Sequence, residues 1–325
     1  MAMAAAIEVS GLQKSFGDHL VLDGVDLDVA QGSVFCLLGP NGAGKSTIVH
    51  ILATLLRADA GQLTVAGCDV ATDPRGVRAA IGVTGQFSAV DELLTGTENL
   101  QLMADLLHLD RAAGRRRAGE LLRRFELTAA AAKPASTYSG GMRRRLDLAM
   151  TLMGTPRLIF LDEPTTGLDP RSRRTMWDSI RGLVRDGVTI FLTTQDLGEA
   201  DQLADRVAVL DRGRVVAEGT PAELKRRIPG GHVELQFASP GDLDAAGRLL
   251  PGAARNEDGL TLQVPGDGSV PGLRALLGQL DDAGIDVANL SIHTPDLDDV
   301  FFAVTGRPAT VHPDPDPEPQ RVAVR

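Results

Sequence analysis

The sequence predicts a two-part chain: an α/β domain with a mostly parallel sheet over residues 6–228, then a small α+β domain over residues 231–306. Short β-branched runs alternate with stretches of helical periodicity up to residue 228, as strands and crossover helices do. Pro229, Gly230 and Gly231 then interrupt this alternation. The length of 325 residues also exceeds one average domain of roughly 100 to 150 residues.

Composition limits the classes of protein that the chain can form. Its hydrophobic fraction of 43% and charged fraction of 23% exclude fibrous and wholly disordered chains. The net charge of −10 disfavours a broad contact with nucleic acid, so we expect no nucleic-acid partner. Cys36 and Cys68 are too few for a disulfide framework or a zinc cluster within one chain.

A membrane role would have to come from a partner protein. No stretch approaches the roughly 20 consecutive apolar residues that a membrane-spanning helix needs. The N-terminus lacks the positively charged start of a secretion signal, so we expect the protein to stay inside the cell.

The elements of the α/β domain follow from periodicity and residue type. Buried strands are expected at residues 33–38, 157–161, 189–194 and 207–210. Residues 88–153 differ, because their leucines follow helical spacing and few residues are β-branched. This stretch predicts a helical insertion in the α/β core.

The part of the chain after residue 231 is expected to contain both strands and helices. The strands are expected at residues 232–237, 260–264 and 287–293, and the helices at residues 242–250, 270–283 and 296–304. Residues 307–325 combine prolines with acidic residues, a composition that cannot bury a core, and we expect this tail to be disordered.

A phosphate-binding loop follows the first buried strand. Its residues fit the pattern G-x-x-x-x-G-K-[ST] and are Gly39, Pro40, Asn41, Gly42, Ala43, Gly44, Lys45, Ser46 and Thr47. A strand enters the loop and an apolar helical stretch leaves it, as this motif requires. The backbone N–H groups of the loop and the helix N-terminus would surround a phosphate. Lys45 would reach the β- and γ-phosphates, and the Ser46 hydroxyl would bind Mg²⁺.

Two acidic residues, Asp162 and Glu163, end the strand at 157–161. Carboxylates at the end of a buried strand are costly to desolvate unless they meet cations. Beside a phosphate loop, Asp162 is expected to act on Mg²⁺ and Glu163 to activate the attacking water. The alternative is a pair of solvated acids in a turn. A loop with Gly167, Leu168 and Asp169 follows.

A second anion site is expected at the start of another helix. Ser139 has the character of an N-cap, and Gly140 and Gly141 leave the first amides of the helix accessible. Arg143, Arg144 and Arg145 follow, and we expect them to lie on solvated helix faces. The alternative is that they approach the nucleotide or the partner chain.

Taken in order, these motifs resemble the nucleotide-binding subunit of ATP-binding cassette (ABC) transporters. The resemblance spans residues 6–228 and is specific, because other P-loop NTPases lack the serine-glycine-glycine signature. It implies a P-loop NTPase fold with a helical subdomain at about residues 88–153. It also implies that the chain binds and hydrolyses ATP with Mg²⁺.

The resemblance assigns further roles by position. Phe16 corresponds to the aromatic residue that stacks on adenine, although a core phenylalanine is the alternative. Gln86 corresponds to the glutamine that contacts Mg²⁺ and the attacking water. Ser139, Gly140 and Gly141 would bind the γ-phosphate held by a second subunit, in a head-to-tail homodimer with ATP at its interface. Asp169 would cross that interface.

Some positions depart from the common pattern of the family. Tyr138 and Met142 stand where most relatives have leucine and glutamine. Tyr138 is still included among the candidate nucleotide contacts. Gln195 stands where most relatives have a histidine that touches the γ-phosphate. Glutamine can donate the same hydrogen bond but does not titrate near neutral pH, so we expect Gln195 to keep the contact and lose the pH sensitivity.

These departures indicate a narrower resemblance, to exporter ATPases of the daunorubicin and doxorubicin resistance type. It rests on four separate segments, which are residues 138–147, Asp162–Arg173, Thr193-Thr194-Gln195 and Leu297-Asp298-Asp299-Val300-Phe301. The last of these extends the resemblance to about Gly306. It implies an actinobacterial ATPase at the cytoplasmic face of the membrane. This ATPase would drive a separate permease to export a hydrophobic, anthracycline-like drug.

Two other functions stay open at this point. The same ATPase could serve another cargo, such as a lipid, a peptide or a polysaccharide, because the substrate path lies in the partner. A soluble ABC ATPase outside transport would need a long coiled-coil insertion or a second cassette, and the sequence has neither. The C-terminal domain could brace the dimer or bind a regulator.

Overall fold

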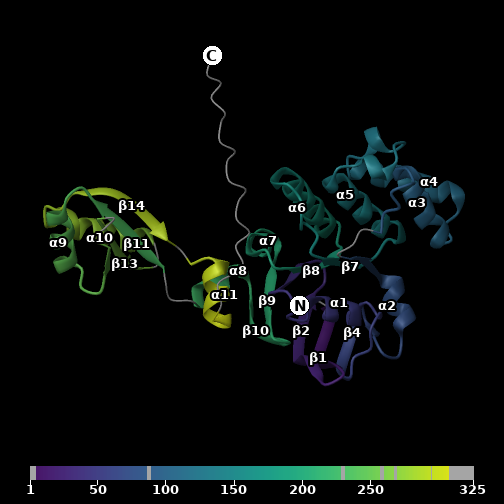
Figure 1. The fold of residues 1–325 in the computed structure, drawn as a ribbon, viewed down its shortest axis with the longest axis horizontal. Helices are drawn as coiled ribbons and strands as arrows, with labels where there is room; N and C mark the ends of the chain where they lie inside the picture. The colour runs from purple at the N-terminus through teal and green to yellow at the C-terminus, as the bar shows by residue number, and fades with distance from the viewer. Residues whose placement is uncertain are drawn as a thin grey trace, which may run out of the picture.

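The structure is a computed structural model that describes residues 5–85, 89–227, 231–256, 260–266, 269–293 and 295–306. It contains a large α/β body and a smaller C-terminal unit, which Figure 1 shows at opposite ends of the molecule. The fold class predicted from the sequence is confirmed.

The central sheet has six strands in the order β10-β9-β3-β8-β7-β6. Five of them are parallel, and β10 pairs antiparallel with β9. Their side chains are apolar because a parallel sheet between helices is buried on both faces. The strands are β3 (Val34–Leu38), β6 (Ile81–Thr84), β7 (Leu158–Asp162), β8 (Thr189–Thr194), β9 (Arg206–Asp211) and β10 (Arg214–Gly219).

A second, antiparallel sheet of four strands has the order β2-β1-β4-β5. This sheet was not expected from the sequence, because register shifts interrupt the alternation of buried and exposed residues where β1 pairs with β2. Helix α1 (Lys45–Leu52) shares one apolar core with both sheets. The strands are β1 (Ala5–Phe16), β2 (His19–Ala30), β4 (Ala60–Val65) and β5 (Cys68–Asp69).

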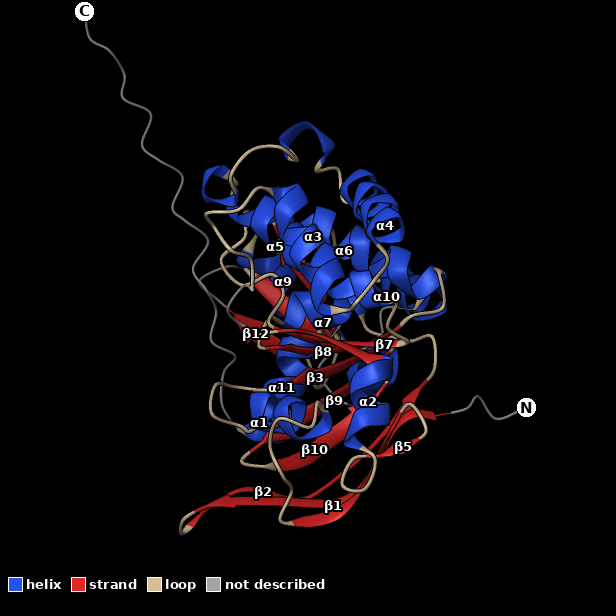
Figure 2. Cartoon of the chain, turned by 90° about the vertical axis from the view of Figure 1, so that its right-hand side faces the viewer, coloured by secondary structure: helices blue, strands red, loops and turns tan. Residues whose placement is uncertain are grey.

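Helices cover the remaining side of the central sheet, and Figure 2 shows them stacked above it. Thr95 and Glu98 form a capping box at the start of α3, which satisfies amides that a helix N-terminus otherwise leaves unpaired. These helices are α3 (Gly96–Leu106), α4 (Arg111–Arg124), α5 (Gly140–Thr151), α6 (Pro170–Arg185) and α7 (Leu197–Leu203), with short 3₁₀ turns at Thr128–Ala130, Ala135–Thr137 and Leu152–Gly154. Helix α2 (Pro74–Ala80) lies on the other side, where its Val77 belongs to the core that contains α1.

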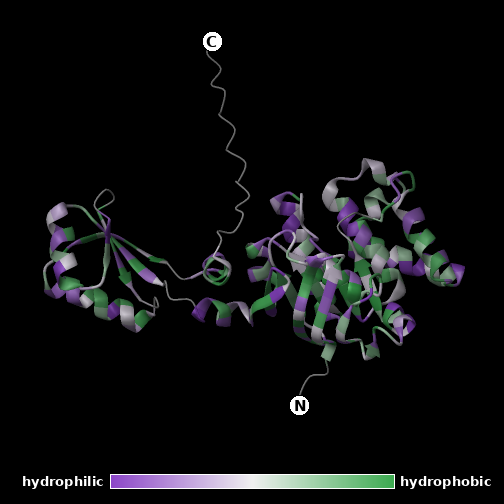
Figure 3. Cartoon of the chain, turned by 60° about the horizontal axis from the view of Figure 1, so that its bottom comes forward, coloured by the Kyte–Doolittle hydropathy of each residue, from purple (hydrophilic) through white to green (hydrophobic). Residues whose placement is uncertain are grey.

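The C-terminal unit is a β-α-β-β-α-β arrangement with the strand order β12-β13-β11-β14. It has a hydrophobic core of its own, and Figure 3 shows hydrophobic segments within it, apart from those of the α/β body. Its elements are β11 (His232–Phe237), α9 (Pro240–Leu249), β12 (Ala254–Asn256), β13 (Thr261–Pro265), α10 (Val270–Asp282) and β14 (Val287–His293).

The last helix, α11 (Leu297–Thr305), packs on the α/β body rather than on the C-terminal unit. It contacts α7, β10 and α8 (Pro221–Arg227). Leu297, Val300 and Phe301 belong to the large core that also includes Leu203 and Leu224. The sequence places this helix in the domain at residues 231–306, so the structure differs there: the apolar stripe of α11 is complementary to α7 and α8.

Candidate functional site

The phosphate loop connects β3 to α1. Gly44 has φ +109° and gives the first turn of α1 no side-chain cap, so the amides there are open to a ligand. Gly39 lies close to the neighbouring strand, because a Cβ on it would be 2.3 Å from the Leu210 carbonyl oxygen. Asn41 and Gly42 are exposed at the turn of the loop. The geometry is that of an anion-binding concavity.

Lys45 is buried within this loop and has 5% of its surface exposed. Its Nζ donates hydrogen bonds to the carbonyl oxygens of Gly39 at 2.7 Å and Pro40 at 3.1 Å, and it lies 3.8 Å from Glu163 Oε1. Burial lowers the pKa of the Lys45 ammonium, while the charges of Glu163 and Asp162 act in the opposite direction. A buried ammonium between carbonyls and carboxylates is well placed to receive a phosphate oxygen.

The acidic pair lies beside the lysine, as the sequence suggests. Asp162 is buried at the end of β7, and the Thr193 hydroxyl donates a hydrogen bond to its carboxylate. Glu163 follows in a left-handed conformation with φ +47° and donates its N–H to the Thr193 carbonyl oxygen at 3.0 Å. The alternative of solvated acids in a turn is therefore wrong, since the two side chains have only 6% and 9% of their surface exposed.

The donors near this pair fit a small, hard cation. Ser46 is half-buried in the first turn of α1, and Asp162 adds a carboxylate. A hydroxyl and one carboxylate suit Mg²⁺, which keeps several waters and takes other oxygens from nucleotide phosphates. Among the described residues no cluster of three or more His, Cys, Asp or Glu side chains could hold a metal by itself. The donor set thus fits Mg²⁺ bound together with a nucleotide.

The N-termini of α5 and α6 form the second part of the candidate site. Ser139 caps α5 by accepting the Met142 N–H, and Asp169 caps α6 by accepting the N–H and hydroxyl of Ser172. The two starts are in contact, because a Cβ on Gly141 would lie 2.5 Å from Ser172 Oγ. Ser139 and Gly140 are exposed. Ser139 and Gly140 therefore face outward from this chain, whereas Gly141 is buried against the start of α6.

The remaining candidates differ in how much the structure describes of them. Phe16 ends β1 with 51% of its surface exposed and has the Lys14 ammonium 5.4 Å from its ring centre, so the alternative of a core phenylalanine is wrong. Gln195 is half-buried directly after β8. Gln86 lies outside the described residues.

Comparison with known proteins gives the family. The family model described as ABC transporter matches residues 22–166. A daunorubicin/doxorubicin resistance ATP-binding protein of Streptomyces peucetius is 49% identical over 309 residues, covering 94% of this chain and 93% of that protein. The chain belongs to the ABC transporter ATP-binding subunits of the daunorubicin/doxorubicin resistance type. This ABC subunit is an ATPase, so the resemblance and the enzymatic activity predicted from the sequence are confirmed.

Other similar proteins agree with this assignment. The ABC subunit is 38% identical to a Nod factor export ATP-binding protein of Ralstonia nicotianae, over 93% of this chain and 94% of that protein. A solved ATP-binding subunit of an ABC transporter superposes with a TM-score of 0.61 at 30% identity, covering 68% of this chain and 92% of that one. No helix within the described residues is long and apolar enough to cross a membrane.

One candidate nucleotide contact of the ABC subunit, Tyr138, lies in the core instead of at the surface. Tyr138 has 4% of its surface exposed, and its hydroxyl donates to the Ala130 carbonyl oxygen at 2.8 Å. Its ring packs within the core of the helical subdomain. Tyr138 is therefore not a nucleotide contact, and this expectation is wrong, because a large aromatic ring with a satisfied hydroxyl gains more from burial than from exposure at the signature.

Two buried polar residues of the ABC subunit were missed. Arg144 was expected on a solvated face, yet only 10% of its side chain is exposed and it pairs with Asp147 at 3.3 Å. Glu199 is 1% exposed and accepts hydrogen bonds from Thr165 and Trp177. An acid three residues after Arg144 on the apolar side of α5 was the available signal; for Glu199 the sequence offers none, since its partners come from distant segments.

Proposed function

We propose that two copies of this ATPase bind two Mg·ATP head to tail and power the export of an anthracycline-like drug through a separate membrane permease, at the cytoplasmic face of the membrane. The observation that carries the proposal is the joint placement of Lys45, Asp162 and Glu163 at one edge of the sheet, in a chain nearly half identical to a drug-resistance subunit along almost its whole length.

The proposed roles of the first chain follow from charge and geometry. The amides of the loop from Gly39 to Thr47 hold the phosphates, and Lys45 neutralises the β- and γ-phosphates. Ser46, Asp162 and Gln86 would hold Mg²⁺, which supplies charge neutralisation at the phosphates when bound. Glu163 accepts a hydrogen bond from the attacking water and takes its proton. Phe16 stacks on the adenine.

The second chain completes each site in this proposal. Ser139, Gly140 and Gly141 present a helix N-terminus to the γ-phosphate. Asp169 lies next to them through the contact of the α5 and α6 starts, and Gln195 donates a hydrogen bond to the γ-phosphate from the first chain. The outward exposure of Ser139 and Gly140 supports a role between chains rather than within one.

Another cargo is the second candidate. The similarity to a Nod factor export subunit favours it to a lesser degree, at 38% against 49% identity. Because the substrate path lies in the permease, the ATPase site itself does not discriminate between these cargoes.

The test uses Glu163→Gln, which keeps the shape of the side chain and removes the base. Purified Glu163→Gln is expected to bind ATP, accumulate as a closed dimer and lose turnover on the order of 10² to 10³-fold, the usual effect of removing a group that acts at the transition state. Unchanged turnover would contradict the assignment of Glu163.

The cargo is tested in a drug-sensitive bacterial host. Coexpression of the wild-type chain with its permease, sought as the multi-spanning protein encoded beside it, is expected to lower the accumulation of fluorescent doxorubicin. Glu163→Gln with the same permease is the matched control and should leave accumulation high. Equal accumulation in both strains would exclude the anthracycline as cargo and favour a different substrate.

A further inference from the structure

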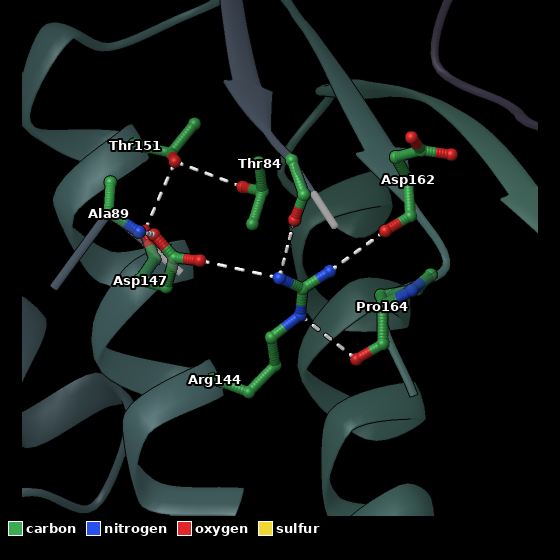
Figure 4. Close-up of polar contacts among 8 residues, drawn as sticks. Thr84, Ala89, Arg144, Asp147, Thr151, Asp162 and Pro164 are labelled. Atoms are coloured by element: carbon green, nitrogen blue, oxygen red, sulfur yellow. Dashed lines mark hydrogen bonds and ion pairs between the residues drawn. The ribbon is translucent and has the colours of Figure 1, made fainter. Parts of the chain in front are cut away.

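The Arg144 guanidinium lies at a junction of three segments beneath the acidic pair. It donates hydrogen bonds to the carbonyl oxygens of Gly85 at 2.8 Å, Asp162 at 3.1 Å and Pro164 at 3.0 Å. Its fourth partner is the Asp147 carboxylate, at 3.3 Å. Figure 4 shows these contacts converging on the one side chain from α5, from the segment after β6 and from the end of β7.

Two of these carbonyls flank Glu163 directly. The residue has φ +47°, a left-handed conformation that a side chain with a Cβ rarely adopts and that persists only where its surroundings hold it. Its N–H is held by the Thr193 carbonyl oxygen. Arg144 holds the carbonyl of the residue before it and that of the residue after it. The guanidinium is thus the side chain that bridges the backbone on both sides of Glu163.

Arg144 is itself held in place. The Asp147 side chain, 4% exposed, accepts from one end of the guanidinium and also from the Ala89 N–H at 3.3 Å. The Thr151 hydroxyl donates to the Asp147 carbonyl oxygen. A planar guanidinium can bond several oxygens in fixed directions at once, whereas a lysine ammonium acts as a point charge and a glutamine amide has fewer donors.

We propose that Arg144 is a positioning residue for ATP hydrolysis, which holds the backbone of Glu163 so that its carboxylate meets the attacking water, and that Asp147 orients Arg144. This proposal rests on the proposed role of Glu163. Arg144 does not touch the nucleotide in this scheme, so it should affect turnover and leave nucleotide affinity unchanged.

The test compares Arg144→Lys and Arg144→Gln with a matched control on the same helix. Arg145→Gln is suitable, because Arg145 also donates to a carbonyl oxygen, that of Phe125, which is far from Glu163 in sequence and outside the acidic pair. Both Arg144 variants should lower kcat about 10²-fold, as a small misplacement of a catalytic group does, with the KM for ATP changed less than about threefold. Arg145→Gln should keep both values near those of the wild type.

A double variant distinguishes this proposal from the assignment of Glu163. If Arg144 acts through Glu163, the double variant with Arg144→Gln and Glu163→Gln should have the same residual single-turnover rate as Glu163→Gln alone. Asp147→Asn should give a smaller loss of kcat than Arg144→Gln. Normal turnover of Glu163→Gln would overturn both proposals, whereas normal kcat in Arg144→Gln with an inactive Glu163→Gln would overturn the positioning role alone.

Two further results would also overturn the positioning role. One is a single-turnover rate in the double variant that is lowered by the product of the two factors seen in the single variants. The other is a joint loss of ATP affinity and melting temperature in both Arg144→Lys and Arg144→Gln, since that pattern would mark a purely structural residue.

Discussion

At the scale of single residues, Glu199 shows how a buried acid links separate segments. Its carboxylate accepts the Thr165 hydroxyl at 2.9 Å and the Trp177 indole N–H at 3.2 Å. Thr165 precedes the loop of Asp169, and Trp177 lies on α6, which Asp169 caps. Burial raises the pKa of Glu199, more than its hydrogen bonds lower it. Folding therefore shifts the proton equilibrium of this carboxyl toward its protonated form.

This raised pKa predicts a pH-dependent stability. A carboxyl whose pKa is higher in the folded state than in the unfolded state stabilises the protein fully below the unfolded pKa, roughly 4.3, and loses this contribution as the pH rises through the folded pKa. The side chain of Glu199→Gln stays neutral at every pH. The free energy of unfolding of this variant, relative to that of the wild type, should therefore be higher at pH 8.5 than at pH 5. The measurement is urea unfolding followed by the fluorescence of Trp177, the one tryptophan of the chain.

The exposed Glu120→Gln is the control for this measurement. Its stability relative to the wild type should change little between the two pH values. The prediction would be contradicted if the difference in unfolding free energy between Glu199→Gln and the wild type did not change with pH. It would also be contradicted if the wild type gained stability relative to the variant at high pH.

At the scale of elements, α11 ends the described part of the chain and packs on the α/β body. Adjacent phenylalanines on this helix have opposite surroundings, since Phe301 is 6% exposed and Phe302 is 56% exposed. Phe301→Ala should destabilise the protein by about 3 to 5 kcal/mol, the usual cost of emptying a buried aromatic site. Phe302→Ala should stay within about 0.5 kcal/mol, as exposed substitutions do.

Denaturant unfolding monitored by Trp177 tests this pair, because the tryptophan packs against the same core as α11. Equal effects of the two substitutions would show that α11 does not pack on the α/β body in solution.

At the scale of the whole molecule, the phosphate loop of one chain and the signature of the other are expected to bind the same ATP. Gly140 is exposed, and a Cβ on it would meet only Leu168 at 3.8 Å. Gly140→Asp should thus fold normally and repel a phosphate. Neither Gly140→Asp nor Lys45→Ala should hydrolyse ATP alone. An equal mixture should recover about a quarter of the wild-type rate, because half of the randomly paired dimers would have one intact site of two.

Analytical mixing of the two purified variants followed by an ATPase assay checks this prediction. A mixture no more active than the sum of its components would contradict the head-to-tail arrangement, provided that both variants still dimerise with the wild type.

Local patterns were enough to predict much of the α/β body and to select the residues of the candidate site. The phosphate loop, the acidic pair and the signature are short runs whose roles depend on neighbours in sequence, so they can be recognised there. The antiparallel sheet of β1, β2, β4 and β5 escaped prediction because β1 pairs with β4 across a long separation in sequence, and because only 10 of the 32 residues in these strands are buried.

The sequence alone was sufficient for the family, the fold class and the ATPase activity, because glycines, a lysine and carboxylates at fixed spacings carry that chemistry. Tertiary structure decided which polar side chains are buried: it placed Tyr138 in the core, Arg144 beneath Glu163 and α11 on the α/β body. Burial depends on segments that come together only on folding. For this reason helical periodicity assigned Arg144 to solvent, and only the packed structure revealed its contacts with both sides of Glu163.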